Sequence, residues 1–185
     1  MKKVLLISAS VLALSAGAAF AQNWQSTYQN GSNNTVGVDQ TGNGGYNSST
    51  IYQGAFSSGA DNSSVNVTQI GGSGATTGSY AQQDGSSLSA TVSQTAAGGS
   101  YQNSSVIQSG SSNAATVTQS APSAGAYEQS SVNQSSNGYW GANNVTVTQS
   151  GVNDSSTVNQ SSGGTGGGLS SVTVTPLSCR NVIAS

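Results

Sequence analysis

The chain consists of short segments in which apolar and small polar residues alternate, and almost every segment ends on glutamine. One kind has the pattern Ser-x-x-x-Gln, and the other has the pattern apolar-x-apolar-x-Gln. The two kinds take turns along the chain and form six strand–turn–strand units. Successive side chains of a β-strand point to opposite sides, so the apolar residues and the glutamine of one segment share a face. The pattern predicts an all-β protein with this face turned inward.

The glutamines that close the first kind of segment recur every 24 to 30 residues. A repeat of this length is typical of a solenoid, in which each unit packs on its neighbours. We therefore expect a β-solenoid of six repeats over residues 22–176, stacked as cross-β. The repeats are expected to start near Trp24, Asn47, Thr77, Gln102, Glu128 and Asp154. The expected ladder of stacked amides consists of Gln29, Asn34, Gln40, Gln53, Gln69, Gln83, Gln94, Gln108, Asn113, Gln119, Gln134, Gln149 and Gln160.

The remaining positions of the repeat also have expected roles. Glycine follows the first glutamine by two residues in three units, where a tight turn needs positive φ; these turn residues are Gly31, Gly85 and Gly110. Valines before the second glutamine are expected to face inward, namely Val36, Val38, Val65, Val67, Val92, Val117, Val145, Val147, Val172 and Val174. Three tyrosines lie seven residues before a glutamine, and we expect them to stack at one corner and pack in the core; they are Tyr46, Tyr101 and Tyr127.

Charged residues make up 4% of the chain, and there is no histidine. After two N-terminal lysines, Arg180 is the only basic residue, against five acidic residues. Nucleic acids and anionic membrane surfaces bind clustered lysine and arginine, so we expect no nucleic-acid partner. An uncharged chain rich in Gln, Asn, Ser and Gly is instead prone to β-association.

The first 21 residues have the pattern of an export signal. Lys2 and Lys3 precede an apolar run at residues 4–14, and Ala-Phe-Ala at residues 19–21 supplies the small residues that a signal peptidase recognises. The run is too short to span a membrane. We therefore expect residues 1–21 to be a signal peptide and the remainder to be exported through the inner membrane.

The two ends of the expected stack favour self-association. The first repeat has no visible cap, and the last has Pro176 in place of glutamine, followed by a tail at residues 177–185 with the lone Cys179. Soluble β proteins protect their edge strands with lysine, proline, bulges or a covering element. Uncharged, self-similar ends favour growth of one chain on the next, and a head-to-tail contact of this kind builds an open filament. The expected partner is therefore the chain itself.

Residues 108–119 carry the complete pattern Gln-x-Gly-x2-Asn-x-Ala-x3-Gln, and residues 29–40 and 83–94 each differ from it at one position. This pattern resembles the repeat of the curlin family, the subunits of curli, which are amyloid fibres that bacteria build on their surface. The resemblance covers nearly all of residues 22–176. It differs in the position six residues before the first glutamine, where curlin repeats usually have serine and this chain has Asn23, Asn47, Thr77, Gln102, Glu128 and Asp154.

The resemblance implies a secreted structural subunit that polymerises outside the cell into a fibre for biofilm matrix and adhesion. It also implies a dedicated outer-membrane secretion pore and a nucleator subunit as partners. It fits a major subunit and a nucleator alike. No cofactor and no small-molecule substrate follow from it.

Two other classes of function compete with that of a structural subunit. An enzyme needs an acid–base group or nucleophile in a cleft, and the scattered acids Asp61, Asp84 and Asp154 are expected in solvated loops or turns, so we expect no enzyme. A monomeric ice- or surface-binding solenoid is the alternative, because threonines line the outward side of the second kind of segment, at Thr91, Thr116, Thr118, Thr146, Thr148, Thr173 and Thr175. Threonine is also a common residue on exposed strands.

Overall fold

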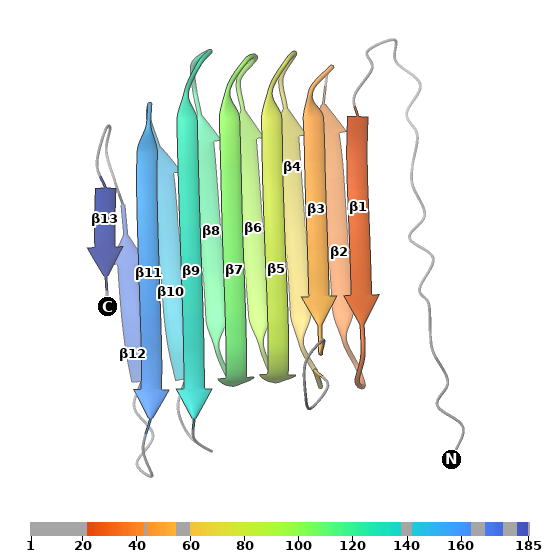
Figure 1. Ribbon diagram of the computed structural model, residues 1–185, viewed down its shortest axis with the longest axis vertical. Coiled ribbons are helices and arrows are strands. Elements are labelled where there is room, and N and C mark those ends of the chain that lie inside the picture. Colours follow the sequence, from red (N-terminus) through yellow and green to blue (C-terminus); the bar gives the residue numbers. More distant parts are fainter. Residues whose placement is uncertain are drawn as a thin grey trace.

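The computed structural model describes residues 22–42, 44–54, 60–137, 142–163, 169–175 and 181–184. Within these ranges the protein is all-β and forms two stacked parallel sheets, which confirms the predicted β-solenoid (Figure 1). No helix in the described part of the chain is long and apolar enough to cross a membrane. The predicted signal peptide, Pro176 and Cys179 lie outside the described residues.

Odd-numbered and even-numbered strands form separate sheets, which we call the odd sheet and the even sheet. Each odd strand leads into an even strand, and the chain then returns to the odd sheet one rung further along (Figure 1). The odd sheet contains β1 (Gln22–Gln29), β3 (Tyr46–Gln53), β5 (Thr76–Ser86), β7 (Tyr101–Ser111), β9 (Tyr127–Asn137), β11 (Asp154–Gly163) and β13 (Asn181–Ala184). The even sheet contains β2 (Thr35–Gly42), β4 (Ser64–Gly71), β6 (Ser89–Ala96), β8 (Ala114–Ala121), β10 (Ala142–Ser150) and β12 (Leu169–Val174).

Equivalent positions of the repeat stack in register. Gln53 of β3 pairs with Gln29 of β1 on one side and with Gln83 of β5 on the other. The even sheet follows the same rule, since Val65 of β4 pairs with both Val36 and Ala90. Every inward position therefore becomes a column that runs through the stack, with neighbouring members one strand spacing apart, about 4.8 Å.

The apolar core is a thin layer between the two sheets. The odd sheet contributes one column, which consists of Ile51, Ala81, Val106, Val132 and Val158. The even sheet contributes buried members from two columns, namely Val65, Val67, Ala90, Val92, Ala115, Val117, Val145, Val147 and Val174. The remaining predicted inward valines pack against this core but are only partly buried; they are Val36, Val38 and Val172. They lie on β2 and β12, the two end strands of the even sheet.

Glycine is required at the turn that follows the odd-sheet glutamine. Gly31, Gly85 and Gly110 have φ values of 121°, 141° and 92°, which L side chains rarely adopt. A Cβ atom at Gly110 would also collide with the backbone carbonyl of Ser136 on the next rung. The tight turn and the close approach of successive rungs both need a residue without a side chain.

The C-terminal segment differs from expectation. Residues 177–185 were expected to form a tail outside the repeats, but β13 extends the odd sheet as a further parallel strand beside β11 (Figure 1). Its register runs from Ser155 opposite Asn181 to Val158 opposite Ala184. The sequence Asn-Val-Ile-Ala lacks the closing glutamine that identified the other strands, so the repeat pattern could not detect it.

Candidate assembly site: polar columns inside the stack

Glutamine side chains form two continuous hydrogen-bonded columns. In each column, Nε2 of one glutamine donates to Oε1 of the glutamine on the next rung. The donor–acceptor distances in the odd sheet are 2.7, 2.9, 2.8, 2.8 and 3.1 Å along Gln29, Gln53, Gln83, Gln108, Gln134 and Gln160. In the even sheet they are 2.7, 2.8, 2.8 and 2.7 Å along Gln40, Gln69, Gln94, Gln119 and Gln149. The structure thus brings together all the glutamines of the predicted ladder.

The glutamines also bond across the interior to the opposite sheet, which the sequence analysis did not foresee. Gln83 on β5 donates its second amide proton to the carbonyl of Ser64 on β4 at 3.1 Å. Gln94 on β6 donates to the carbonyl of Gly78 on β5 at 2.9 Å. The same cross-sheet bond recurs at Gln40, Gln53, Gln69, Gln108, Gln119, Gln134 and Gln149. One buried amide therefore bonds successive rungs and also joins the two sheets.

The prediction that Asn34 and Asn113 belong to an amide ladder is wrong. Asn113 Nδ2 donates to the carbonyl of Ser109 at 2.7 Å, and its Oδ1 accepts from the backbone N–H of Asn143 at 3.3 Å. Asn34 likewise bonds backbone groups, including the carbonyl of Ala60 at 2.6 Å. Both asparagines hold the turn and connect it to the next rung. Asn34 and Asn113 are separated by rungs with Ser63 and Leu88 at this position, and Asn143 on the rung after Asn113 bonds it through its backbone N–H and not through its amide.

A second set of inward polar residues lies at the start of the odd strands, and we call it the mixed column: Asn23, Asn47, Thr77, Gln102, Glu128 and Asp154. All of them are buried except Asn23 on the first rung, which is partly exposed. These residues pair in register from β1 to β11. Thr77 Oγ1 donates to Asn47 Oδ1 at 2.7 Å, and Asn47 Nδ2 donates to Asn23 Oδ1 at 3.0 Å. From the sequence, these positions were interpreted as departures from serine near the repeat starts, and no inward role was predicted for them. Their spacing of six from the inward glutamine, an even number, was the signal that they also face inward.

The last two members of the mixed column are acids. Glu128 and Asp154 are both 0% exposed and pair directly between β9 and β11. Gln102 Nε2 donates to Glu128 Oε2 at 2.6 Å, and the backbone N–H of Gly151 donates to Glu128 Oε1 at 3.3 Å. Burial raises the pKa of Glu128 to about 7, and the charge of Asp154 adds to the rise. The prediction that Asp154 lies in a solvated loop or turn is wrong, because it opens β11 as an inward residue.

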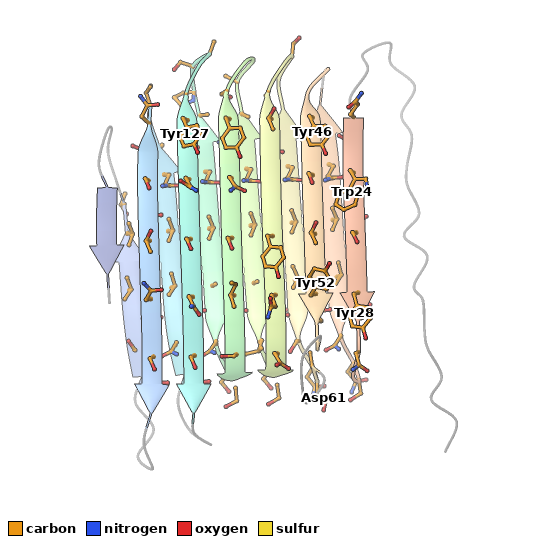
Figure 2. The ribbon with its side chains drawn as sticks, in the orientation of Figure 1. Trp24, Tyr28, Tyr46, Tyr52, Asp61 and Tyr127 are labelled. Atoms are coloured by element: carbon orange, nitrogen blue, oxygen red, sulfur yellow. The ribbon has the colours of Figure 1, made fainter. Side chains whose placement is uncertain are left out.

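The pKa of Asp61, at the surface, shifts in the opposite direction to that of the buried Glu128. Asp61 is exposed beside the turn between β1 and β2, and both the hydroxyl and the backbone N–H of Ser32 donate to its Oδ1, at 2.7 and 2.8 Å (Figure 2). These hydrogen bonds lower the pKa of Asp61. The exposed acid therefore favours its charge, whereas the buried Glu128 favours its proton.

Buried serines form a further column between the mixed column and the apolar core. It consists of Ser49, Ser79, Ser104, Ser130 and Ser156. Their hydroxyl oxygens have no hydrogen-bond partner within the described residues. A serine reaches neither the backbone of the opposite sheet nor the next serine in its column. The small side chain therefore fits the thin interior, while its hydroxyl contributes no bond to the stack.

The first rung exposes residues that later rungs bury. Thr27 of β1 occupies the column of Ile51 but is exposed, and Val38 of β2 is only partly buried where its neighbour Val67 is 2% exposed. Within the described residues, β1 and β2 each pair with one strand only and form the edge of their sheets (Figure 1). This end face presents inward columns and unpaired strand edges together.

The outer faces of the two sheets differ. Aromatic side chains lie on the odd sheet, where Tyr28 and Tyr52 have ring centroids 6.4 Å apart (Figure 2). Tyr101 and Tyr127 stack at 4.9 Å. The prediction that Tyr46, Tyr101 and Tyr127 pack in the core is wrong, because all three are about 40% exposed. Their spacing of seven from the glutamine, an odd number, turns them outward. Tyr46 also does not join the stack, because Thr76 lies between it and Tyr101.

Threonines line the outer face of the even sheet. One column runs in register through Thr91, Thr116, Thr146 and Thr173, and Thr118 stacks beside Thr148 in a second column. Both columns lie on the face opposite the buried valines. The predicted threonine face is therefore present as a regular array.

No protein-family model matches the chain, and comparison with curated proteins and with solved structures finds no match. Any functional conclusion therefore depends on the columns and on the end face.

Proposed function

We propose that the chain is a secreted structural subunit that grows end to end into curli-like amyloid fibres, which serve as biofilm matrix and in surface adhesion. The open first rung carries this proposal. A rung from a second copy would cover Thr27, Val36 and Val38 and would continue the parallel pairing of β1 and β2. The interaction repeats contacts that already join the rungs within one chain.

The amide columns supply the specificity of the contact. A glutamine can stack on the glutamine of any other rung, because its side chain both donates and accepts. Buried amides that keep their partners avoid a cost of about 1–3 kcal/mol each. The edge strands also carry little that opposes pairing, since β1 has no charged residue and β2 has only Asp39.

The resemblance to curlin repeats supports the cellular setting. It implies export through the inner membrane, passage through an outer-membrane pore and growth from a nucleator subunit. The export pattern of residues 1–21 agrees with this setting. Adhesion would use the outer faces of the fibre, because growth along the stack leaves both faces exposed.

Charging the end face tests the proposal. Thr27→Lys combined with Val38→Lys places two lysines where the next copy would dock, and we expect seeded elongation, followed by thioflavin fluorescence, to slow about tenfold or more. The matched control is Ser26→Lys combined with Thr35→Lys, on the outward side of the same two strands, and it should elongate within about twofold of the unmodified chain. Equal elongation of the two variants would contradict growth through this end.

A monomeric ice- or surface-binding protein is the second candidate, and the in-register threonine columns of the even sheet favour it. Thr116→Val and Thr146→Val would keep the shape of the face and remove its hydroxyls. Under this candidate the folded monomer slows ice growth and the two variants do not. A chain that forms seeding-competent fibres and leaves ice growth unchanged would reject it.

A further inference from the structure

The two sheets contain different numbers of strands. Within the described residues the odd sheet has seven strands and the even sheet has six, because β13 follows β11 whereas no strand follows β12 (Figure 1). The described stack therefore finishes on half a rung. The added strand is also short, since β13 pairs with β11 at four positions, whereas β1 pairs with β3 at eight.

Strand β13 takes the place that the first strand of a second copy needs. In the proposed fibre, β1 and β2 of another copy form the rung that follows β11 and β12. The register that runs from β1 to β11 would then set β1 beside β11, with Gln29 opposite Gln160. Because β13 already pairs with β11 from Ser155 to Val158, β1 and β13 cannot both lie on this edge.

The even sheet shows why a second copy cannot simply add beyond β13. Its register would set β2 of that copy beside β12, with Val38 opposite Val174 in one apolar column. If β13 stayed on β11, the second copy would lie one strand spacing further along, about 4.8 Å. The even sheet would then lack a strand between β12 and β2. The backbone groups on both sides of this gap would lose their sheet partners, which is unfavourable inside a stack.

The last glutamine of the odd sheet is not matched by β13. On the preceding rung, Gln134 Nε2 donates to Gln160 Oε1 at 3.1 Å and also to a backbone carbonyl of the even sheet. Gln160 Nε2 donates instead to Ser170 Oγ at 3.1 Å, and β13 ends opposite Val158, before it reaches this position. Gln29 of a second copy would continue the column there, as the next glutamine does on every earlier rung.

We propose that β13 is a displaceable strand: it covers β11 in the isolated chain, and a second copy displaces it when its β1 and β2 dock on β11 and β12. This inference rests on the proposed fibre and identifies the docking face. Residues 175–180 form a short link between β12 and β13, so β13 has a high effective concentration at β11, on the order of mM. A copy that adds strands to both sheets at once makes the larger contact and replaces it. Until then β13 protects the edge strand and slows growth.

Weakening β13 tests the proposal in the chain from residue 22 onward. Val182→Pro combined with Ile183→Pro removes two adjacent backbone donors, and proline is poorly tolerated in a paired strand. We expect seeded elongation, followed by thioflavin fluorescence, to become about threefold faster or more, because the tethered competitor is lost. The matched control, Val182→Ile combined with Ile183→Val, keeps two strand-forming residues and should elongate within about twofold of the unmodified chain. Elongation of the proline variant at or below the unmodified rate would overturn the proposal.

Locking β13 onto β11 should have the opposite effect. Thr157 pairs with Ile183, and a Cα separation of about one strand spacing, ~4.8 Å, suits a disulfide. In a Cys179→Ser background, the protein with Thr157→Cys and Ile183→Cys should elongate about tenfold more slowly or less when oxidised than after reduction, because the strand can no longer leave. Ser105→Cys with Ser131→Cys joins β7 to β9 within the stack and is the matched control. Its elongation rate should change by less than about twofold on reduction.

The locked protein also separates this inference from the proposed function. Fibres that grow at equal rates from its oxidised and reduced forms would overturn the role of β13 and leave the fibre itself in place. An unmodified chain that forms no fibres, together with variants that form none, would contradict the proposed function and the role of β13 with it.

Discussion

The odd-sheet glutamine column and the mixed column lie in the same strands and are both buried, but they differ in how they repeat. The first carries glutamine in all six rungs from Gln29 to Gln160, whereas the mixed column contains two asparagines, a threonine, a glutamine and two acids in succession. An identical amide stacks on any rung, including a rung of another copy. A varied column stacks well only on its own neighbours. In the proposed fibre, contacts between copies would therefore depend on the glutamine columns, whereas the side chains of the mixed column differ from rung to rung.

The largest expected effect comes from interrupting the glutamine column. Gln108→Leu leaves Gln83 Nε2 without its acceptor and Gln134 Oε1 without its donor, both in the buried interior. We expect a loss of about 3 kcal/mol in the free energy of unfolding, together with slower fibre formation, in denaturant titration and thioflavin kinetics. Gln129→Leu, on the exposed side of β9, is the control and should change stability by less than about 0.5 kcal/mol.

The second largest effect is expected from placing an acid in the odd-sheet glutamine column, which tests whether this column and the mixed column differ only in the chemistry of their side chains. Gln134→Glu places an acid in the glutamine column, where it should behave as Glu128 does. At pH 8 the ionised group can no longer donate to Gln160, and we expect a loss of about 2 kcal/mol. At pH 4 the protonated acid restores the donor, and the loss should be below about 1 kcal/mol. The losses are measured by denaturant unfolding. Equal losses at both pH values would show that the shape of the side chain, and not its protonation, determines the stability of the variant.

A smaller effect is expected from neutralising one acid of the mixed column. Asp154→Asn removes the like charge beside Glu128 and should raise the stability at pH 8 by about 1 kcal/mol. The pKa of Glu128 should move down from about 7, although burial keeps it above its ordinary value. Glu128 is the only glutamate in the sequence, so a carbon-13 label in the glutamate carboxyl group gives one resonance whose titration measures this shift. An unchanged midpoint would mean that Asp154 does not influence Glu128.

The smallest effect is expected in the serine column. Ser104 is 0% exposed, and its hydroxyl has no partner in the described part of the chain. Ser104→Ala removes this buried hydroxyl without opening a large cavity, so the change should be within about 1 kcal/mol and towards higher stability. A clear loss of stability in thermal unfolding would indicate that this hydroxyl does have a role in the stack.

Periodicity made much of this arrangement predictable from the sequence. Alternation along each segment and the recurrence of glutamine indicated the two sheets, the valine core and the stacked glutamines. The mixed column and the outward tyrosines follow from the same alternation, but the chemical type of these residues and the resemblance to curlin repeats led to a different prediction for them. Counting parity from the glutamine would have placed Glu128 inward and Tyr127 outward.

Other features could not be obtained by counting. The cross-sheet bonds of the glutamines depend on how close the two sheets lie, and spacing along the chain does not contain this distance. The backbone contacts of Asn34 and Asn113 depend on the shape of the turn. Strand β13 lacks the repeat pattern altogether and is identified only by its pairing with β11.

The most direct test of the central claim is assembly of the chain from residue 22 onward. The protein is diluted from denaturant, thioflavin fluorescence is followed, and the product is examined by fibre diffraction. We expect fibres with reflections near ~4.7 Å and ~10 Å that seed fresh monomer. A folded monomer that neither forms fibres nor responds to seeds would contradict it and would favour the threonine face as the functional surface.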